Sequence, residues 1–404
     1  MTPGPRRPWR GRRVVLGVTG GIAAYKSVQL ARDLTRLGAE VDVVMTASAT
    51  EFVGPLSFEG VTGRPVGAPL LAPGSAPLHI GLAREADAVC VAPATADFLA
   101  RAAHGRSDDL LGAILLATRA PVLLCPAMND LMWSHPATLA NAERVRSALG
   151  YRLCGPATGP LAFGEGEGPG RMEELAVIVQ HVGRLLEPPG PWAGRRVVVT
   201  AGPTREALDP VRYLSNRSSG RMGVALAAAA WRRGADVALI HGPLEVAPPP
   251  GPDSLEARSA GAMLDAVRSA LPSADALIMA AAVADFRPAA PASEKLGKEE
   301  RPDVLELTAT ADILASTLQD RSERLATLGF ALETDGGLAS ARDKLARKSL
   351  DQIALNVAGA DSGFETDTNR VTLLDREGRE EELPVLSKDE TAEAILDRFA
   401  RFLR

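Results

Sequence analysis

The chain starts the same local pattern twice, once near its N-terminus and once near its middle. The apolar runs Val14–Val18 and Val197–Val199 each lead into a glycine-containing turn, and a helical pattern follows each turn. Each predicted helix ends at a glycine, Gly38 or Gly234, which is a common helix stop, and a second apolar run comes next. Two β-α-β units with continuous apolar strands predict parallel sheets covered on both faces. The sequence therefore predicts two doubly wound α/β domains.

The length of 404 residues is enough for two domains with separate cores. We expect a disordered tail over residues 1–11, a first domain over 12–184, a proline-rich linker over 185–194 and a second domain over 195–404. Ligands of such domains bind at the carboxyl ends of the strands. Further strands are expected at Ala88–Ala92, Val122–Cys125, Ala276–Ala280, Leu325–Ala331 and Gln352–Asn356.

Composition excludes several classes of protein. The net charge of −5 gives no basic field that would favour nucleic acid. The three cysteines, Cys90, Cys125 and Cys154, form no C-x-x-C pair, which argues against a disulfide framework or a cysteine zinc site. The basic N-terminus does not look like a signal peptide, and no apolar run approaches the ~18 residues of a membrane helix. We expect a cytoplasmic globular protein.

The polar stretch Ala201–Gly223 lies between a predicted strand and a predicted helix. Backbone N–H groups at a helix N-terminus, with small residues that let an anion approach, form a phosphate site. Forked cationic donors suited to phosphate or carboxylate come from Arg205, Arg212, Arg217 and Arg221. Plain βα loops are much shorter, so this stretch predicts a ligand site.

The first glycine-rich turn, Gly17–Lys26, has neither the G-x-G-x-x-G spacing of a dinucleotide site nor a P-loop ending. A mononucleotide phosphate fits better, with Thr46 and Ser48 as additional hydroxyl donors, although a tight turn without a ligand would give the same pattern. Pro93, Ala94 and Thr95 end another predicted strand, where small residues could lie against a flat ring.

Three polar side chains in the first half are candidates for chemistry or for a helix cap. Asn129 follows a strand directly, where its amide NH₂ group can hold a carboxylate. His79 is the strongest acid–base candidate of this half, although a single histidine is more often structural. Ser107 begins a helical pattern as a plausible N-cap.

The motifs of both halves resemble known enzymes. In order, GVTGGIAAYK, MTASAT, HIGLA, APATADFLAR, SDDL, PAMNDLMW and GPGRM resemble the FMN-binding cysteine decarboxylases, which have a flavodoxin-like fold. The second half, from AGPTREALDPVRYLSNRSSGRMG through AAVADF and GFALET, resembles phosphopantothenate–cysteine ligase, with a Rossmann-like fold. Over roughly residues 12 to 400 the chain is similar to the family in which these two enzymes of coenzyme A biosynthesis are fused.

For the first half, the resemblance implies FMN-dependent decarboxylation of phosphopantothenoylcysteine to 4′-phosphopantetheine. It implies that His79 is the catalytic base and that Asn129 grips the carboxylate that leaves. The cofactor residues implied by motif match are Gly17, Thr19, Gly20, Gly21, Thr46, Ser48, Pro93, Ala94, Thr95 and Ser107.

For the second half, the resemblance implies activation of 4′-phosphopantothenate by CTP and Mg²⁺ as an acyl-cytidylate, which cysteine then attacks. Asn216 matches the residue that contacts the acyl intermediate, Arg212 the residue needed for its conversion, and Lys295 a lysine that supports cytidylate formation. The nucleotide-binding residues implied are Ala281, Ala282, Asp285, Lys295, Asp312, Ile313, Phe330, Lys344 and Lys348. No metal-ligating residue is assigned. The family also implies a homo-oligomer, a dodecamer built from trimers and dimers.

One position departs from the family pattern. Phe163 stands where these decarboxylases have a cysteine that protonates the enethiolate, and Cys154 lies outside the motif. Another acid, such as Glu165 or a water molecule, is expected to take this role. The alternatives are a chain active only as a ligase and a first half that serves as a regulatory flavin module. A NAD-dependent dehydrogenase is disfavoured, since neither half has the dinucleotide fingerprint.

Overall fold

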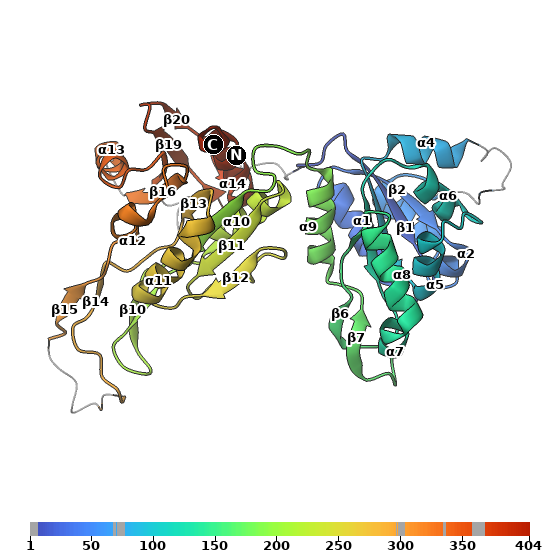
Figure 1. Cartoon of the computed structure of the whole chain (residues 1–404), viewed down its shortest axis with the longest axis horizontal. Coiled ribbons are helices and arrows are strands. Elements are labelled where there is room, and N and C mark those ends of the chain that lie inside the picture. Colours follow the sequence, from blue (N-terminus) through green and yellow to red (C-terminus); the bar gives the residue numbers. More distant parts are fainter. Residues whose placement is uncertain are drawn as a thin grey trace. The chain divides into compact units, whose positions relative to one another are not determined.

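The computed structural model describes residues 7–67, 70, 77–295, 297, 304–333, 337–357 and 368–404. The chain forms two compact units, and the division between them falls between Pro188 and Pro189. Each unit is an α/β domain with its own sheet and helices on both faces (Figure 1), as the sequence predicted. No helix in the described ranges is long and apolar enough to cross a membrane.

The N-terminal sheet has five parallel strands in the order β2-β1-β3-β4-β5, the order of the flavodoxin-like fold. The strands are β1 (Arg13–Val18), β2 (Glu40–Met45), β3 (Ala88–Ala94), β4 (Val122–Pro126) and β5 (Arg152–Leu153). The expected strands at Ala88–Ala92 and Val122–Cys125 are confirmed within two residues at each end.

Side chains of each central strand alternate between two hydrophobic clusters, one on each face of the sheet. Val14 and Leu16 of β1 pack on one face, and Val15 between them packs on the other. The first face is covered by α1 (Ala24–Arg36), α3 (Pro55–Thr62) and α9 (Leu175–Leu186), and the second by α4 (Leu78–Glu85), α5 (Ala96–Ala103), α6 (Leu110–Ala117) and α8 (Pro136–Ser147). Short helices α2 (Ala47–Thr50) and α7 (Asp130–Ser134) follow β2 and β4.

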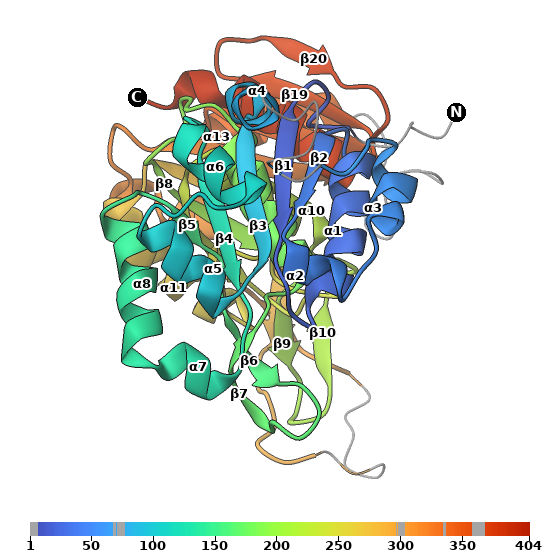
Figure 2. The same cartoon turned by 90° about the vertical axis from the view of Figure 1, so that its right-hand side faces the viewer.

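A hairpin that the sequence did not predict packs against α7 (Figure 2). Its strands are β6 (Ala157–Pro160) and β7 (Glu167–Arg171). Two glycines of β7 allow this close contact. A Cβ atom on Gly168 would lie 2.7 Å from the Cβ of Asp130, and one on Gly170 would lie 2.2 Å from the carbonyl oxygen of Met128. The hairpin therefore packs closely against the segment that follows β4, and side chains at Gly168 and Gly170 would prevent this contact.

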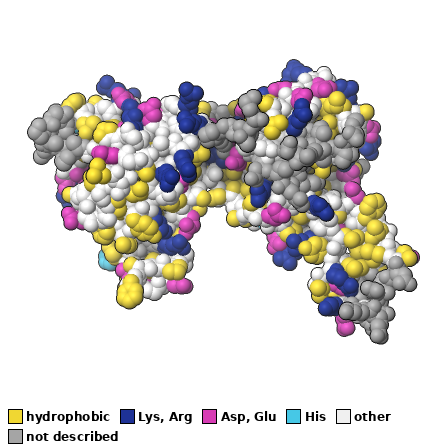
Figure 3. Space-filling model, turned by 180° about the vertical axis from the view of Figure 1, so that it is seen from behind, with side chains coloured by type: hydrophobic (Ala, Val, Ile, Leu, Met, Phe, Trp, Pro, Cys, Tyr) yellow, Lys and Arg dark blue, Asp and Glu magenta, His cyan; other side chains and the backbone are white. Residues whose placement is uncertain are grey.

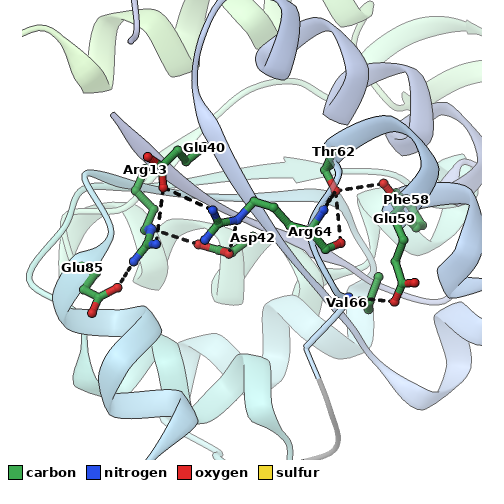
Figure 4. Close-up of polar contacts among 9 residues, drawn as sticks. All are labelled: Arg13, Glu40, Asp42, Phe58, Glu59, Thr62, Arg64, Val66 and Glu85. Atoms are coloured by element: carbon green, nitrogen blue, oxygen red, sulfur yellow. Dashed lines mark hydrogen bonds and ion pairs between the residues drawn. The ribbon is translucent and has the colours of Figure 1, made fainter. Parts of the chain in front are cut away.

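A network of charged groups joins the amino ends of β1 and β2 to the segment after α3 (Figure 4). Asp42 accepts from Arg64 Nε at 2.8 Å, and its other oxygen lies 3.2 Å from Arg13 Nε. Arg13 and Arg64 also approach Glu40, at 3.4 and 3.3 Å. These contacts fix the end of the sheet opposite to the carboxyl ends of its strands.

The C-terminal sheet has the strand order β12-β11-β8-β13-β16-β17-β19-β20. The first six strands are parallel and the last two are antiparallel additions. Read from β8, the parallel part has the Rossmann order 3-2-1-4-5-6, so the topology reverses between β8 and β13. The strands are β8 (Arg196–Ala201), β11 (Asp236–His241), β12 (Asp253–Glu256), β13 (Ala276–Met279), β16 (Ala326–Glu333), β17 (Gln352–Val357), β19 (Val371–Asp375) and β20 (Glu380–Glu382).

Two helices, α10 (Arg221–Arg232) and α14 (Lys388–Phe399), cover one face of this sheet around Trp192 and Trp231. The other face carries α11 (Ala260–Ala270), α12 (Ile313–Ser316) and α13 (Gly337–Arg347). Small strand pairs complete the domain: β9 (Arg205–Ala207) with β10 (Tyr213–Ser215), β14 (Phe286–Pro288) with β15 (Leu307–Ala309), and β18 (Thr368–Asn369) with β21 (Leu386–Ser387).

Two local expectations were wrong. Ser107 does not cap a helix, because α6 begins at Leu110 and Asp109, with an extended backbone, accepts from the N–H of Gly112 at 2.8 Å. Residues 7–11, expected in a disordered tail, are ordered: Trp9 is buried in the core, and its backbone N–H donates to the carbonyl of Leu37. An apolar ring so close to the first strand gains by packing against the sheet. Residues 1–6 lie outside the described part of the chain.

Candidate functional site

A cavity of about 780 Å³ lies at the carboxyl ends of β1, β3 and β4 in the N-terminal domain. It is lined by eight of the residues selected from the sequence: Thr19, Gly20, Gly21, Thr46, Ser48, Pro93, Thr95 and Asn129. Residues from the hairpin and its loop close one side, among them Pro160, Leu161, Ala162, Glu165, Gly170 and Arg171. The loops that sequence reasoning singled out therefore meet in one place.

Thr19 joins the ends of β1 and β3. Its buried hydroxyl donates to the carbonyl of Pro93 at 2.7 Å and accepts from the N–H of Thr95 at 3.1 Å. The hydroxyl of Thr95 in turn caps α5 by accepting from Phe98 N–H at 3.3 Å. These hydroxyls connect the loop after β1 to the loop after β3. The wall of the cavity formed by Pro93 and Thr95 is therefore held in place by hydrogen bonds within the protein.

The turn after β1 approaches the start of α2 very closely. A Cβ on Gly20 would lie 2.3 Å from the Cβ of Ser48 and 2.7 Å from its carbonyl carbon, so only glycine fits. Thr46 caps α2 by accepting from Ala49 N–H. In the described structure no side chain caps α1, whose N-cap residue is Ala23. Hydroxyls and the amino end of a 13-residue helix thus face the same part of the cavity.

Asn129 is held at both ends of its side chain. Its Oδ1 accepts from Leu131 N–H at 2.9 Å and so caps α7, while its Nδ2 donates to Glu165 Oε2 at 3.0 Å. The first bond fixes the amide orientation and directs the NH₂ group into the cavity. In this structure the NH₂ group of Asn129 is already hydrogen-bonded to the carboxylate of Glu165.

Four residues selected from the sequence do not line this cavity: Gly17, His79, Ala94 and Ser107. Gly17 lies within β1, where a Cβ would lie 2.6 Å from Leu111 Cδ1, so its role in this domain is to let the sheet and α6 approach. Ala94 is buried in the core. His79 is half-buried near the start of α4, and its Nδ1 has no hydrogen-bond partner among the described residues.

The three cysteines lie together in the core of the N-terminal domain rather than in the cavity. Hydrogen bonds to Cys125 and then to His181 lower the pKa of the Cys154 thiol to about 6, and burial raises that of Cys125. Cys154 is only 2% exposed, so it is not in a position to act on a ligand of the cavity.

A second cavity, of about 350 Å³, lies where the topology of the C-terminal sheet reverses. It is lined by five residues selected from the sequence: Asn216, Ala281, Ala282, Asp285 and Phe330. Asn216 Nδ2 donates to the carbonyls of Ala282 and Val283, at 3.2 and 3.0 Å, and this joins the polar stretch after β8 to the end of β13. Gly220, in a left-handed conformation, caps α10 and places its amino end at the cavity.

Comparison with known proteins gives the same division of the chain. Residues 5–187 match the family described as Flavoprotein, and residues 192–403 match the DNA/pantothenate metabolism flavoprotein C-terminal domain. A coenzyme A biosynthesis bifunctional protein CoaBC from Vibrio cholerae is 45% identical over 391 residues, which are 96% of this chain and 97% of that protein. The chain belongs to this bifunctional family.

Other members of the CoaBC family are similarly related. The protein of that name from Mycobacterium tuberculosis is 44% identical over 407 residues and covers 97% of both chains. Among solved structures, the C-terminal domain of a CoaBC protein is 36% identical, with a TM-score of 0.46; the match covers 53% of this chain and 97% of that one.

Several ligase residues expected from the CoaBC family pattern do not line the second cavity: Arg212, Lys295, Asp312, Ile313, Lys344 and Lys348. Ile313 is buried, so only its backbone could contact a ligand. Lys348 Nζ forms an ion pair with Asp312 Oδ2 at 2.8 Å. Partial burial opposes ionisation of Asp312, but Lys348 and the N–H of Ala315 outweigh it and lower the pKa of the carboxyl.

Sequence reasoning missed three polar residues that line the second cavity: Asn356, Asn369 and Lys388. The Oδ1 atoms of Asn356 and Asn369 are buried and have no hydrogen-bond partner in the described part of the chain. Asn356 could have been found, because it is a polar residue near the carboxyl end of an apolar strand. No local signal marks Asn369, which reaches the site through a separate two-residue strand.

Proposed function

We propose that the chain carries out two consecutive steps of coenzyme A biosynthesis. The C-terminal domain would join cysteine to 4′-phosphopantothenate with CTP and Mg²⁺, and the N-terminal domain would decarboxylate the product to 4′-phosphopantetheine with FMN. The observation that carries this proposal is that each domain has a cavity at the carboxyl ends of its own strands, lined by the motif residues of the matching enzyme. Because the reaction consumes CTP, we expect it to take place in the cytoplasm.

The first cavity fits FMN in size and in its polar groups. The uncapped start of α1, Gly20, Thr46 and Ser48 would hold the phosphate, and the fixed wall at Pro93 and Thr95 would lie against the ring. When bound, FMN supplies reversible acceptance of two electrons. The protein orients the substrate beside it.

Asn129 would bind the carboxylate that the substrate loses, because its Oδ1 is held by Leu131 N–H and its NH₂ group, the donor a carboxylate needs, faces the cavity. His79, the proposed base, is outside the cavity of its own domain. We propose that it acts in a site shared between subunits of a homo-oligomer, a dodecamer as in the family pattern.

Apolar side chains on the surface around the first cavity support such an assembly. Ile22 and Tyr25, which line the cavity, are 66% and 60% exposed, and Leu131 and Met132 of α7 are 74% and 50% exposed. Figure 3 shows apolar side chains, interspersed with polar and charged ones, at the lower left, where α7 and the hairpin lie. Exposed large apolar side chains of this kind favour contact with another protein surface.

The second cavity would bind the nucleotide. The amino end of α10, with Ser218, Ser219 and Arg221, would receive the triphosphate, and Asp285 would contact the base or sugar. Among the described residues no group of three or more His, Cys, Asp or Glu side chains is arranged to hold a metal ion. We propose that phosphate oxygens supply most of the Mg²⁺ ligands, as they commonly do in nucleotide sites.

The test is mass spectrometry of the products formed by purified protein with FMN, 4′-phosphopantothenate, cysteine, CTP and Mg²⁺. We expect 4′-phosphopantetheine. Phosphopantothenoylcysteine as the only product would support the ligase activity and contradict the decarboxylase activity. Release of pyrophosphate with 4′-phosphopantothenate and CTP alone, and of cytidine monophosphate only once cysteine is added, would establish the order of the ligase half.

A further inference from the structure

Glu165 and Asn129 form a direct side-chain hydrogen bond within the first cavity, with Oε2 and Nδ2 3.0 Å apart. We propose that Glu165 is the acid of the decarboxylase site and gives its proton to the substrate carbon that has lost carbon dioxide. This inference rests on the proposed decarboxylase function, in which Asn129 binds the departing carboxylate. A group beside Asn129 is beside that carbon.

The fold holds Glu165 next to Asn129 through the hairpin loop. The N–H of Glu165 donates to the carbonyl of Ala162 at 2.9 Å, which closes a turn within the loop. The hairpin itself is tied to the segment before α7, because Met128 N–H donates to the carbonyl of Gly170 at 2.9 Å. Asn129 and Glu165 are 36 positions apart in sequence. They are held together because the hairpin that carries Glu165 is hydrogen-bonded to Met128, the residue before Asn129.

The other acidic groups nearby are less suited to this role. The carboxylates among the described residues that line the cavity are Asp97 and Glu165, and Asp97 faces Arg101 at 3.9 Å. Cys154 is buried in the core away from the cavity. Phe163 is fully exposed and carries no proton to donate. Glu165 is the carboxyl group in this lining that contacts Asn129.

Substrate binding would also displace Glu165 from Asn129. A substrate carboxylate on the Asn129 amide would take the donor that Glu165 now occupies. Glu165 would then lie beside the substrate carboxylate rather than on the Asn129 amide. The structure thus shows the free protein with its own carboxylate in the position proposed for the carboxylate of the substrate.

Oxidation of the substrate thiol to a thioaldehyde and loss of carbon dioxide would leave an enethiolate, N–CH=CH–S⁻, and bound FMN would supply the acceptance and later return of the two electrons. The C=C pair takes the proton of the Glu165 carboxyl and forms a C–H bond at the decarboxylated carbon, which restores the C=S double bond. Return of the two electrons with a proton, as hydride, to the carbon that bears sulfur would then give the product thiolate. Water reprotonates Glu165.

The test uses the full-length protein with FMN and the variant Glu165→Gln, which keeps an acceptor oxygen for Asn129 but has no carboxyl proton. Its matched control is Glu167→Gln, an exposed residue at the start of β7 that does not line the cavity. Phosphopantothenoylcysteine is mixed with each protein without oxygen, and two quantities are followed: the mass of the product and the visible absorbance of oxidised flavin.

For Glu165→Gln we expect flavin reduction and carbon dioxide release at near wild-type rates. The product should be two hydrogens lighter than 4′-phosphopantetheine, and the return of flavin absorbance should slow about 100-fold or more, as for loss of a general acid. Glu165→Asp should recover part of that rate. Return of flavin absorbance at the wild-type rate in Glu165→Gln would overturn the proposal, as would loss of flavin reduction itself. If wild-type protein never releases carbon dioxide, the decarboxylase function itself is wrong.

Discussion

Asp209 holds Arg212 with both oxygens of its buried carboxylate. Oδ1 accepts the backbone N–H groups of Val211 and Arg212 at 2.8 and 2.7 Å, and Oδ2 accepts Arg212 Nε at 2.8 Å and also its Nη2. The Arg212 side chain remains 43% exposed, while that of Asp209 is fully covered. The orientation of Arg212 is therefore set by a partner three residues before it, in the turn between β9 and β10.

Asp209→Asn is predicted to impair the second half of the ligase reaction more than the first. The variant keeps Oδ1 for the turn but places an NH₂ group against the guanidinium, so Arg212 loses its orientation. Loss of charge-assisted bonds worth about 1.5–3 kcal/mol corresponds to a fall of about 10- to 100-fold in conversion of the acyl-cytidylate. The measurement is accumulation of the acyl-cytidylate in quenched reactions. A variant that instead shows a raised KM for CTP and an unchanged kcat would contradict this assignment.

Gly20→Ala is predicted to weaken FMN binding by on the order of 10-fold, because overpacking a close contact costs about 1–3 kcal/mol. The added methyl group would lie 2.3 Å from Ser48 Cβ and within 2.8 Å of its backbone, so the turn and α2 must move apart. The ratio of bound flavin to protein and a titration of the apoprotein with FMN measure the effect. The control is Gly60→Ala on the exposed side of α3, where a Cβ meets nothing within 4 Å and flavin binding should be unchanged.

The sequence was informative where function depends on short loops after apolar strands. Thr19, Gly20, Thr95 and Asn129 lie within three residues of a strand end, so topology alone brings them together. The hairpin β6–β7 was missed because its strands, ATGP and EGPGR, have no apolar alternation. The contact between Asn129 and Glu165 depends on that hairpin and was therefore not predictable.

The second cavity also contains a residue whose position could not be predicted from the local sequence. Asn369 donates through its Nδ2 to Met222 Sδ at 3.2 Å, across 147 positions of sequence. Thr368–Asn369 forms only a two-residue strand, whose place is set by pairing with Leu386–Ser387. Local periodicity carries no information about such a pairing, whereas Ala281 and Ala282 follow directly from the end of β13.

The Asp312–Lys348 pair gives a pH-dependent contribution to the stability of the C-terminal domain. Because the folded protein lowers the pKa of Asp312 below its ordinary value, the contribution is present above that value and is lost as pH falls through the folded pKa. Asp312→Asn keeps the cap of α12, since Asn caps as well as Asp, but removes the ion pair. We expect a loss of at most about 1 kcal/mol at neutral pH, given the exposure of the pair.

The measurement for Asp312→Asn is the free energy of unfolding in urea at several pH values. The difference from wild type should be constant at neutral pH and should shrink below about pH 4, where the ordinary carboxyl protonates. A difference that persists unchanged at acidic pH would mean that the substitution acts through the cap rather than through Lys348.

Asn369 presents a buried acceptor to the second cavity, and we predict that a donor group of the nucleotide satisfies it. The residue is 3% exposed, and its Oδ1 has no partner among the described residues. An unsatisfied buried polar atom costs about 1–3 kcal/mol, so Asn369→Ala should change the stability of the free protein little while raising the KM for CTP about 10-fold or more. Thermal unfolding without ligand and ligase kinetics with varied CTP separate the two effects.

Asn369→Asp, which keeps the shape but adds a negative charge near the amino end of α10, should raise the KM further if the triphosphate binds there. An unchanged KM in both variants, with lower thermal stability, would instead assign Asn369 to packing against Met222.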